Sequence, residues 1–265
     1  MTMAEAPISF ADATAYESFM GRWSRAVAPH FLRWMDPQRR ARWLDVGCGT
    51  GILTEALLHL CEPASVMGID SAAPQVDHAS RTLAEARLQF RQADAMRMPF
   101  PHHSFDCTVS ALVLNFIAEP SSAVAEMGRV TARGGAVGAY VWDFARELSP
   151  SGPFRQAMRA FGAEVPPIPG TAHSTIAALR SLFAGAGLRA VDSTTIEVTL
   201  AYPKFDDYWS AQTPSYAPTT RIIDAMSDSE RRRLKRAVQD ALPAGVLGKI
   251  EYTARANAVR GTVPR

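Results

Sequence analysis

The sequence has few cysteines, and none of them belongs to a Cys-x-x-Cys pair. Cys48, Cys61 and Cys107 are the 3 cysteines in 265 residues. A disulfide framework would need an even set, and a structural zinc site would need closely spaced pairs. No set of His, Asp and Glu has metal-ligand spacing either. The pattern predicts reduced thiols and no bound metal, and it disfavours a metal-dependent mechanism.

The chain also lacks an excess of charge and any long hydrophobic run. Its 28 basic and 26 acidic residues give a formal net charge of +2, too little to indicate nucleic acid or an anionic membrane as partner. The longest apolar stretch, 109–118, is too short to span a bilayer, and Glu5 and Asp12 stand where a signal segment would be apolar. We expect a cytoplasmic protein that acts on small molecules and neither binds nucleic acid nor inserts into membranes.

The most informative stretch is Trp-Leu-Asp-Val-Gly-Cys-Gly-Thr-Gly at residues 43–51. It reads as a buried strand that ends near Asp45, followed by three alternating glycines and a helix from about residue 52. Glycines permit backbone conformations that side chains forbid and let a ligand touch the main chain. The helix start adds unpaired N–H groups and a positive dipole end. The stretch therefore predicts a loop that binds a nucleoside cofactor.

The glycine spacing distinguishes between two cofactor classes. A dinucleotide fingerprint that begins at Gly47 and Gly49 needs a third glycine at position 52, where this chain has Ile52. The third glycine is Gly51. This spacing, led by Asp45, resembles motif I of the class I S-adenosylmethionine-dependent methyltransferases. The resemblance implies S-adenosyl-L-methionine as cofactor, with Asp45 orienting the loop.

Alternating strand and helix patterns predict an α/β fold, a Rossmann-like, doubly wound sheet with helices on both faces. Strands are expected near 41–46, 65–70, 88–94, 105–113 and 136–142, and helices near 52–60, 72–86 and 119–132. Residues 195–200 and 249–259 alternate polar and apolar side chains, as half-exposed antiparallel strands do. The family resemblance implies that these two complete a seven-stranded sheet as a C-terminal antiparallel pair.

Three parts of the chain are expected. Residues 1–40 would form an N-terminal helical cover, 41–143 the cofactor-binding core, and 144–265 the remaining strands with two insertions. These helical cover insertions, 144–170 and 202–247, would lie over the substrate, because ligands of open α/β sheets bind beyond the carboxyl ends of the strands. A helix over 228–241 begins with a Ser-x-x-Glu capping box and carries five basic residues, which we interpret as a solvated face.

The resemblance implies further cofactor contacts at strand ends. Asp70 ends the second strand, where a carboxylate can accept hydrogen bonds from both ribose hydroxyls; nicotinamide enzymes use the same contact. Asp94 would meet the adenine amino group while Ala95 offers its N–H. The remaining cofactor contacts expected by resemblance are Gly47, Cys48, Gly49 and Gly51 in the loop, Ser71 after the second strand, and Ser110 and Ala111 at the end of the fourth.

Residues 16–24, Tyr-Glu-Ser-Phe-Met-Gly-Arg-Trp-Ser, resemble the N-terminal helix of the quinone-biosynthesis-type branch of these enzymes. In that branch the helix folds over the cofactor, which implies that Tyr16 and Arg22 flank the methionine carboxylate. A surface amphipathic helix with Phe19, Met20 and Trp23 in the core is an equally good interpretation. The resemblance covers most of the chain, but its motifs are specific only for the cofactor.

The acceptor side has candidates but no motif. Asn115 and Trp142 lie at or just beyond strand ends, and Tyr208 and Trp209 lie in the second insertion, so these four are the predicted substrate-binding residues. His173 and Asn115 are the candidates for a general base, which methyl transfer from a sulfonium does not always need. His102 and His103 are expected to face solvent.

The sequence therefore predicts methyl transfer from S-adenosylmethionine to a small, apolar or aromatic acceptor, catalysed mainly by in-line positioning. Two alternatives stay open. The chain could be a catalytically silent cofactor-binding or regulatory domain, or a nicotinamide oxidoreductase, against which Ile52 argues. The acceptor atom and the oligomeric state do not follow from the sequence.

Overall fold

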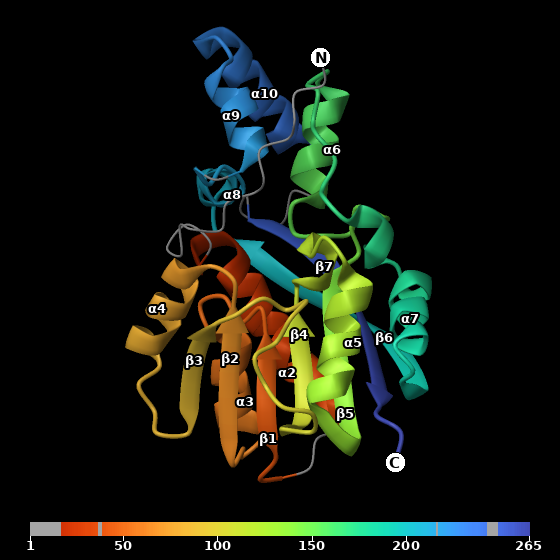
Figure 1. Ribbon diagram of the computed structural model, residues 1–265. Helices are drawn as coiled ribbons and strands as arrows, with labels where there is room; N and C mark the ends of the chain where they lie inside the picture. Colours follow the sequence, from red (N-terminus) through yellow and green to blue (C-terminus); the bar gives the residue numbers. More distant parts are fainter. Residues whose placement is uncertain (1–16, 37–38, 216, 243–248) are drawn as a thin grey trace.

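The computed structural model describes residues 17–36, 39–215, 217–242 and 249–265. Figure 1 shows a central sheet with helices on both faces and a helical group beyond one end of the strands. In chain order the elements are η1 (Glu17–Gly21), α2 (Arg22–Met35), β1 (Arg42–Val46), α3 (Ile52–Leu60), β2 (Ser65–Asp70), α4 (Ala73–Thr82), β3 (Leu88–Gln92), β4 (Phe105–Ala111), η2 (Leu114–Phe116), α5 (Pro120–Val130), β5 (Thr131–Trp142), α6 (Gly152–Ala160), η3 (Thr171–Ser174), α7 (Ile176–Gly185), β6 (Arg189–Tyr202), α8 (Phe205–Gln212), α9 (Pro218–Asp224), α10 (Asp228–Ala241) and β7 (Ile250–Thr262).

The sheet has seven strands in the order β3-β2-β1-β4-β5-β7-β6. The first five of these are parallel, and β7 pairs antiparallel with both β5 and β6. The chain order reverses between β1 and β4, and ligands of doubly wound sheets bind at such a switch point. The predicted seven-stranded fold with its C-terminal antiparallel pair is thus confirmed.

Two apolar clusters cover the two faces of the sheet. One packs α2 and α3 on the sheet through Trp23, Phe31 and Leu57, all fully buried. The other packs α5 and α7 on the opposite face through Met127 and Phe183. Helix α2 therefore lies directly on the sheet as a core element, which matches the interpretation that placed Phe19 and Trp23 in the core.

Strand β5 begins earlier than the sequence predicts. The expected strand 136–142 is the second half of Thr131–Trp142, and the expected helix 119–132 ends at Val130. The pairing with β4 shifts register between Phe105 and Cys107, so the Arg-Gly-Gly segment at 133–135 forms a bulge inside the strand. Periodicity misses this, because a bulge breaks the alternation on which strand prediction depends. The predicted helix 72–86 likewise ends earlier, at Thr82.

The helices α6, α8, α9 and α10 form the cover, which lies beyond the carboxyl ends of β5 and β6 (Figure 1). Helix α6 follows β5, and α8 follows β6, so both insertions leave the sheet at the same edge. Helix α10 matches the predicted range 228–241, and Ser227 and Glu230 form the expected capping box. The topology therefore places the predicted cover at the edge where the glycine loop lies.

Candidate cofactor and acceptor site

The glycine loop joins β1 to α3 and is held by the neighbouring strand. The backbone N–H groups of Gly47 and Cys48 both donate to the carbonyl of Ile69, at 2.7 and 2.9 Å. Gly51 is the N-cap of α3, and its N–H donates to Cys48 O at 2.9 Å. The loop is thus fixed to β2, and the chain enters α3 with its free N–H groups at the carboxyl edge of the sheet.

Two glycines of the loop are needed for different reasons. Gly47 has φ +73°, and a Cβ there would lie 2.5 Å from Val113 Cγ2. Gly49 has φ +53°, but a Cβ there would meet no atom within 4 Å. Gly47 therefore lets the loop pass the β4–η2 connection, whereas the space beside Gly49 is open to a ligand that approaches the main chain.

A buried carboxyl group lies under the loop. Asp45 is fully buried, and its Oδ2 accepts a hydrogen bond from Thr54 Oγ1 at 2.7 Å. Oδ1 has no hydrogen-bond partner within the part of the chain that the structure describes. Burial, opposed by the Thr54 bond and assisted by the negative charge of Asp70, raises the pKa of Asp45 to about 7. A cation in the loop would supply the partner that Oδ1 lacks.

Asp70 connects the end of β2 to the open side of the loop. Its Oδ2 accepts the N–H of Gly49 at 3.0 Å, and Oδ1 accepts the N–H of Ala72 at 2.9 Å. Burial raises the pKa of Asp70, and these two backbone bonds oppose the rise. Ser71 follows, and its carbonyl accepts Gln92 Nε2 at 2.9 Å. The carboxylate is thereby placed beside the open backbone of Gly49.

The loop after β3 is fixed by an ion pair on α5. Asp94 Oδ1 accepts the N–H of Met96 at 2.8 Å, so Asp94 forms a tight turn with Ala95 inside it. Glu126 accepts the N–H of Met98 at 2.7 Å, while Arg129 donates to the carbonyls of Met98 and Phe100 at 3.0 and 2.8 Å. Strand order places this loop next to the end of β2.

The end of β4 contributes backbone to the site. The buried hydroxyl of Ser110 donates to Val46 O at 2.9 Å, so it ties β4 to β1. Ala111 is the last residue of β4, and Leu112 follows with φ +62°. Cys48 is buried in the loop, and desolvation raises the pKa of its thiol well above the usual value. A protonated thiol agrees with a structural role for Cys48.

The N-terminal helix reaches the loop through a residue that the sequence analysis missed. Glu17 Oε1 accepts Thr50 Oγ1 at 2.5 Å, and its Oε2 accepts Arg25 at 2.7 Å. Arg22 points elsewhere: it donates to Ala201 O at 2.9 Å, and its guanidinium lies 4.8 Å from the ring centroid of Tyr202. Tyr16 lies outside the described residues. Of these two described residues, Glu17 and not Arg22 contacts the glycine loop.

The two candidates for a general base lie on segments that touch each other. Asn115, in η2, is buried, and its Nδ2 donates to Pro169 O at 3.5 Å. A Cβ on Gly170 would overlap the backbone of Asn115, so the two segments touch. The N–H of His173, in η3, donates to Gly170 O at 2.9 Å. The fold therefore brings Asn115 near His173, whereas the ring of His102 is exposed and His103 Nδ1 lies 2.9 Å from Thr131 O.

A chain of aromatic rings connects two of the predicted acceptor residues. Trp142 meets Trp23 edge-on with centroids 6.1 Å apart, Trp23 lies 5.0 Å from Tyr252, and Tyr252 lies 5.8 Å from Tyr208. Trp142 Nε1 and the Tyr208 hydroxyl are buried without a hydrogen-bond partner among the described residues. Trp209 contacts Phe154 and Phe205, and both of these rings also contact Tyr208, so Trp209 joins the same aromatic group indirectly.

Four residues near the proposed site were not expected there from the sequence: Glu17, Trp23, Thr54 and Tyr252. Thr54 could have been identified from the sequence, because a hydroxyl in the first turn of a helix can reach back to the end of the preceding strand. Tyr252 could not, because its place in the aromatic chain depends on which strands pair.

Among the described residues, no group of three or more His, Cys, Asp or Glu side chains could hold a metal ion. Within the same residues, no helix combines the length and the apolar character that a membrane span requires.

Comparison with known proteins identifies the core of the chain. Residues 44–138, from β1 into β5, match the family described as the methyltransferase domain. This segment therefore resembles a methyltransferase domain. The matched segment contains the glycine loop, Asp70 and the Asp94 turn, the same elements that the structure brings to one edge of the sheet.

Curated relatives of the methyltransferase domain match over part of their length. Phosphatidylethanolamine N-methyltransferase of Cereibacter sphaeroides is 33% identical over 127 residues, which are 46% of this chain and 61% of that protein. Demethylmenaquinone methyltransferase of Thermus thermophilus is 39% identical over 97 residues, 36% of this chain and 44% of that protein. The matched stretches thus span less than two thirds of these relatives.

Solved structures extend the likeness of fold to nearly the whole chain. The YcgJ protein from Bacillus subtilis has a TM-score of 0.59 at 18% identity and covers 92% of this chain and 99% of its own. Phosphoethanolamine N-methyltransferase 2 of Haemonchus contortus, solved with S-adenosyl-L-methionine, has a TM-score of 0.57 at 15% identity, with 97% of this chain and 58% of that chain covered.

Proposed function

We propose that this protein transfers a methyl group from S-adenosyl-L-methionine to a small-molecule acceptor. The observation that carries the proposal is the acidic, open glycine loop. The backbone of Gly49 is accessible, the carboxylate of Asp70 lies 3.0 Å from its N–H, and Asp45 presents an unpartnered buried oxygen below it. The proposal includes the individual cofactor contacts that the sequence analysis expects.

The charges around the loop favour a cationic cofactor over a dinucleotide. Three carboxyl side chains, from Glu17, Asp45 and Asp70, surround the loop, and of these only Glu17 is paired with an arginine. A pyrophosphate would be repelled by the carboxylates of Glu17 and Asp70, whereas a sulfonium and an ammonium group would be attracted. Ile52 is buried in α3, so the helix also packs without the third glycine of a dinucleotide fingerprint.

The chain's own residues would mainly bind the cofactor and the acceptor and orient them toward each other. S-adenosylmethionine supplies a methyl group that its sulfonium already activates. Asp70 would accept the ribose hydroxyls, the Asp94 turn would hold the adenine end, and the backbone at Gly49 and Ala111 would contact the methionine part. The aromatic residues at the carboxyl edge would exclude water and hold the acceptor in line, which lowers the barrier by fixing the attack geometry.

A flat apolar or aromatic acceptor suits this edge of the sheet. The connected rings of Trp142, Trp23, Tyr252 and Tyr208 run from the sheet and α2 to α8 of the cover. The unpartnered Trp142 Nε1 and Tyr208 hydroxyl would offer hydrogen bonds to an oxygen or nitrogen of the acceptor. The relatives are named for lipid and quinone acceptors, which supports a small organic acceptor. Asn115 and His173 are proposed as the groups that could remove a proton from it.

The test is incubation of the protein with methyl-labelled S-adenosylmethionine and a soluble and lipid metabolite extract, followed by mass spectrometry. A labelled small molecule that requires Asp70 supports the proposal and names the acceptor. If the cofactor binds in a calorimetric titration but no extract component gains the label, the chain is a silent binding domain. If the cofactor does not bind at all, the cofactor assignment itself is wrong.

A further inference from the structure

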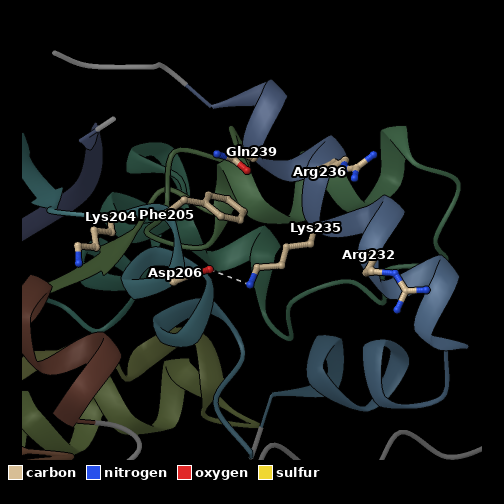
Figure 2. Close-up of a pocket in the computed structure, with 7 residues that line it drawn as sticks. All are labelled: Lys204, Phe205, Asp206, Arg232, Lys235, Arg236 and Gln239. Atoms are coloured by element: carbon tan, nitrogen blue, oxygen red, sulfur yellow. Dashed lines mark ion pairs between the residues drawn. The ribbon is translucent and has the colours of Figure 1, made fainter. Parts of the chain in front are cut away.

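A cavity of about 330 Å3 lies between α8 and α10 in the cover, and none of the proposed cofactor residues lines it. Figure 2 shows the seven residues that do: Lys204, Phe205, Asp206, Arg232, Lys235, Arg236 and Gln239. Sites for small molecules usually measure roughly 300–1,000 Å3. The cavity has room for a small molecule that combines an apolar part with a charged group.

The lining has a marked excess of positive charge. Four of its side chains are cationic, and its carboxylate, Asp206, is paired with Lys235 at 2.7 Å. Within the described part of the chain, Lys204, Arg232 and Arg236 have no carboxylate partner. By contrast, residues 204–241 as a whole hold 7 basic and 6 acidic residues. The positive charge is therefore concentrated at the cavity, which favours a localised anion over an extended anionic surface.

Helix α10 holds three of these cations on one face. Arg232, Lys235, Arg236 and Gln239 follow the spacing i, i+3, i+4 and i+7 of a helix face. On the other side of the helix Leu234 and Val238 are fully buried. The sequence alone indicates a solvated basic face on α10. In the structure, part of that face lies across the cavity from Lys204, Phe205 and Asp206.

Phe205 supplies an apolar wall to the cavity. Figure 2 shows Lys235 extending from α10 toward Asp206 on α8, with the Phe205 ring beside this pair. The ammonium of Lys235 lies 6.0 Å from the centroid of Phe205 and 5.7 Å from that of Trp209. A ring or alkyl chain could lie on Phe205 while an anionic group meets the cations around it.

We propose that this cavity binds an organic phosphate, that is, a phosphate group attached to an apolar body. Arg232 and Arg236 carry planar guanidinium groups, whose paired N–H donors match phosphate oxygens, and Lys204 adds a point charge, whereas Lys235 is paired with Asp206. Such a ligand would bridge α8 and α10. The proposal concerns a site apart from the glycine loop and does not depend on which acceptor is methylated. The phosphate could belong to a soluble ester or to a lipid headgroup.

The test is a calorimetric titration of the intact protein with phenyl phosphate, with phenol as the probe that lacks the phosphate. We expect saturable binding of phenyl phosphate, none of phenol at the same concentrations, and at least ten-fold weaker binding in the double variant Arg232→Gln/Arg236→Gln. Arg233→Gln is the matched control. Arg233 lies on the same helix, but its guanidinium packs 5.6 Å from the Phe161 centroid and does not line the cavity.

Vesicles that contain phosphatidic acid, compared with neutral vesicles, distinguish the source of the phosphate. Binding of these vesicles alone, lost in the double variant and kept in Arg233→Gln, supports a lipid headgroup. Binding of phenyl phosphate with the same dependence supports a soluble ester. The proposal is overturned if neither probe binds, if phenol binds as well as phenyl phosphate, or if Arg233→Gln loses as much affinity as the double variant.

Discussion

The hydroxyl of Thr54 donates to Asp45 Oδ2 across 2.7 Å, and both side chains are fully buried. This bond partly compensates the burial of a carboxyl group whose Oδ1 has no hydrogen-bond partner among the described residues. The pair lies directly under the glycine loop, so its protonation state affects both the stability of the fold and the charge that a cofactor meets.

The first prediction concerns the pH dependence of stability. Burial raises the pKa of Asp45 to about 7, above its unfolded value of 3.8, so the folded state holds the proton more tightly. The resulting stabilisation is fully present below about pH 4 and is lost as the pH rises through 7, by up to about 4 kcal/mol. Asp45→Asn should lose this dependence. Urea unfolding of both proteins at pH 5 to 8 measures it, and parallel curves would exclude Asp45 as the cause.

The second prediction concerns Asp70. Asp70→Ala should weaken S-adenosylmethionine binding by about 2 kcal/mol or more, because the ribose hydroxyls lose a charged acceptor. Asp77→Ala is the control, since Asp77 is an exposed carboxyl group on the adjacent α4. Isothermal titration calorimetry of the three proteins measures the difference. An Asp70→Ala protein that is folded and binds with unchanged affinity would remove Asp70 from the site.

The third prediction separates two glycines of the loop. Gly47→Ala places a Cβ against Val113, whereas Gly49→Ala meets open space, and both residues have positive φ. Both variants carry roughly 1–2 kcal/mol of left-handed strain, but Gly47→Ala adds a clash and should be clearly less stable. Gly49→Ala should stay folded yet bind the cofactor weakly. Thermal unfolding and calorimetry together check this, and equal unfolding temperatures would contradict it.

The fourth prediction concerns the ion pair that holds the loop after β3. Arg129 pairs with Glu126 at 2.5 Å, and together they make three hydrogen bonds to the backbone of Met98 and Phe100. Arg129→Met should remove the hydrogen bonds to these two carbonyls and the cation paired with Glu126, which would keep only the Met98 N–H, and should cost roughly 1–3 kcal/mol. Hydrogen exchange should increase in residues 94–100 and not in β1. Exchange that rises equally in both segments would indicate global destabilisation instead.

The fifth prediction compares two buried tyrosines. Tyr252 donates to Pro150 O at 2.7 Å and accepts from Gln212 at 3.1 Å, whereas the Tyr208 hydroxyl has no partner among the described residues. Tyr252→Phe should destabilise the protein by about 1 kcal/mol or more, and Tyr208→Phe should be neutral or stabilising. If Tyr208 contacts the acceptor, Tyr208→Phe should still lower kcat/KM. Unfolding and turnover measurements separate the two roles.

The residues proposed to hold the cofactor follow largely from local sequence patterns. The glycine spacing at 47, 49 and 51 and the carboxylate at 70 are local patterns, and parallel strands bring their ends to one edge whatever their details. The parallel part of the sheet followed from the alternation of strands and helices, whereas its completion to seven strands was implied by the family resemblance. Local sequence patterns did not predict the bulge at 133–135, because the bulge depends on the register in which β5 pairs with β4.

The acceptor half was decided by the tertiary structure. The sequence named Trp142, Tyr208 and Asn115 one by one, but only the packing of α2 and the pairing of β6 with β7 place Trp23 and Tyr252 between the first two. Packing likewise directed Arg22 to β6 and Glu17 to the glycine loop. The sequence by itself determined the elements and the cofactor loop, since these depend on residues close along the chain. Contacts between distant segments depend on side-chain shape and strand register, which no local pattern contains.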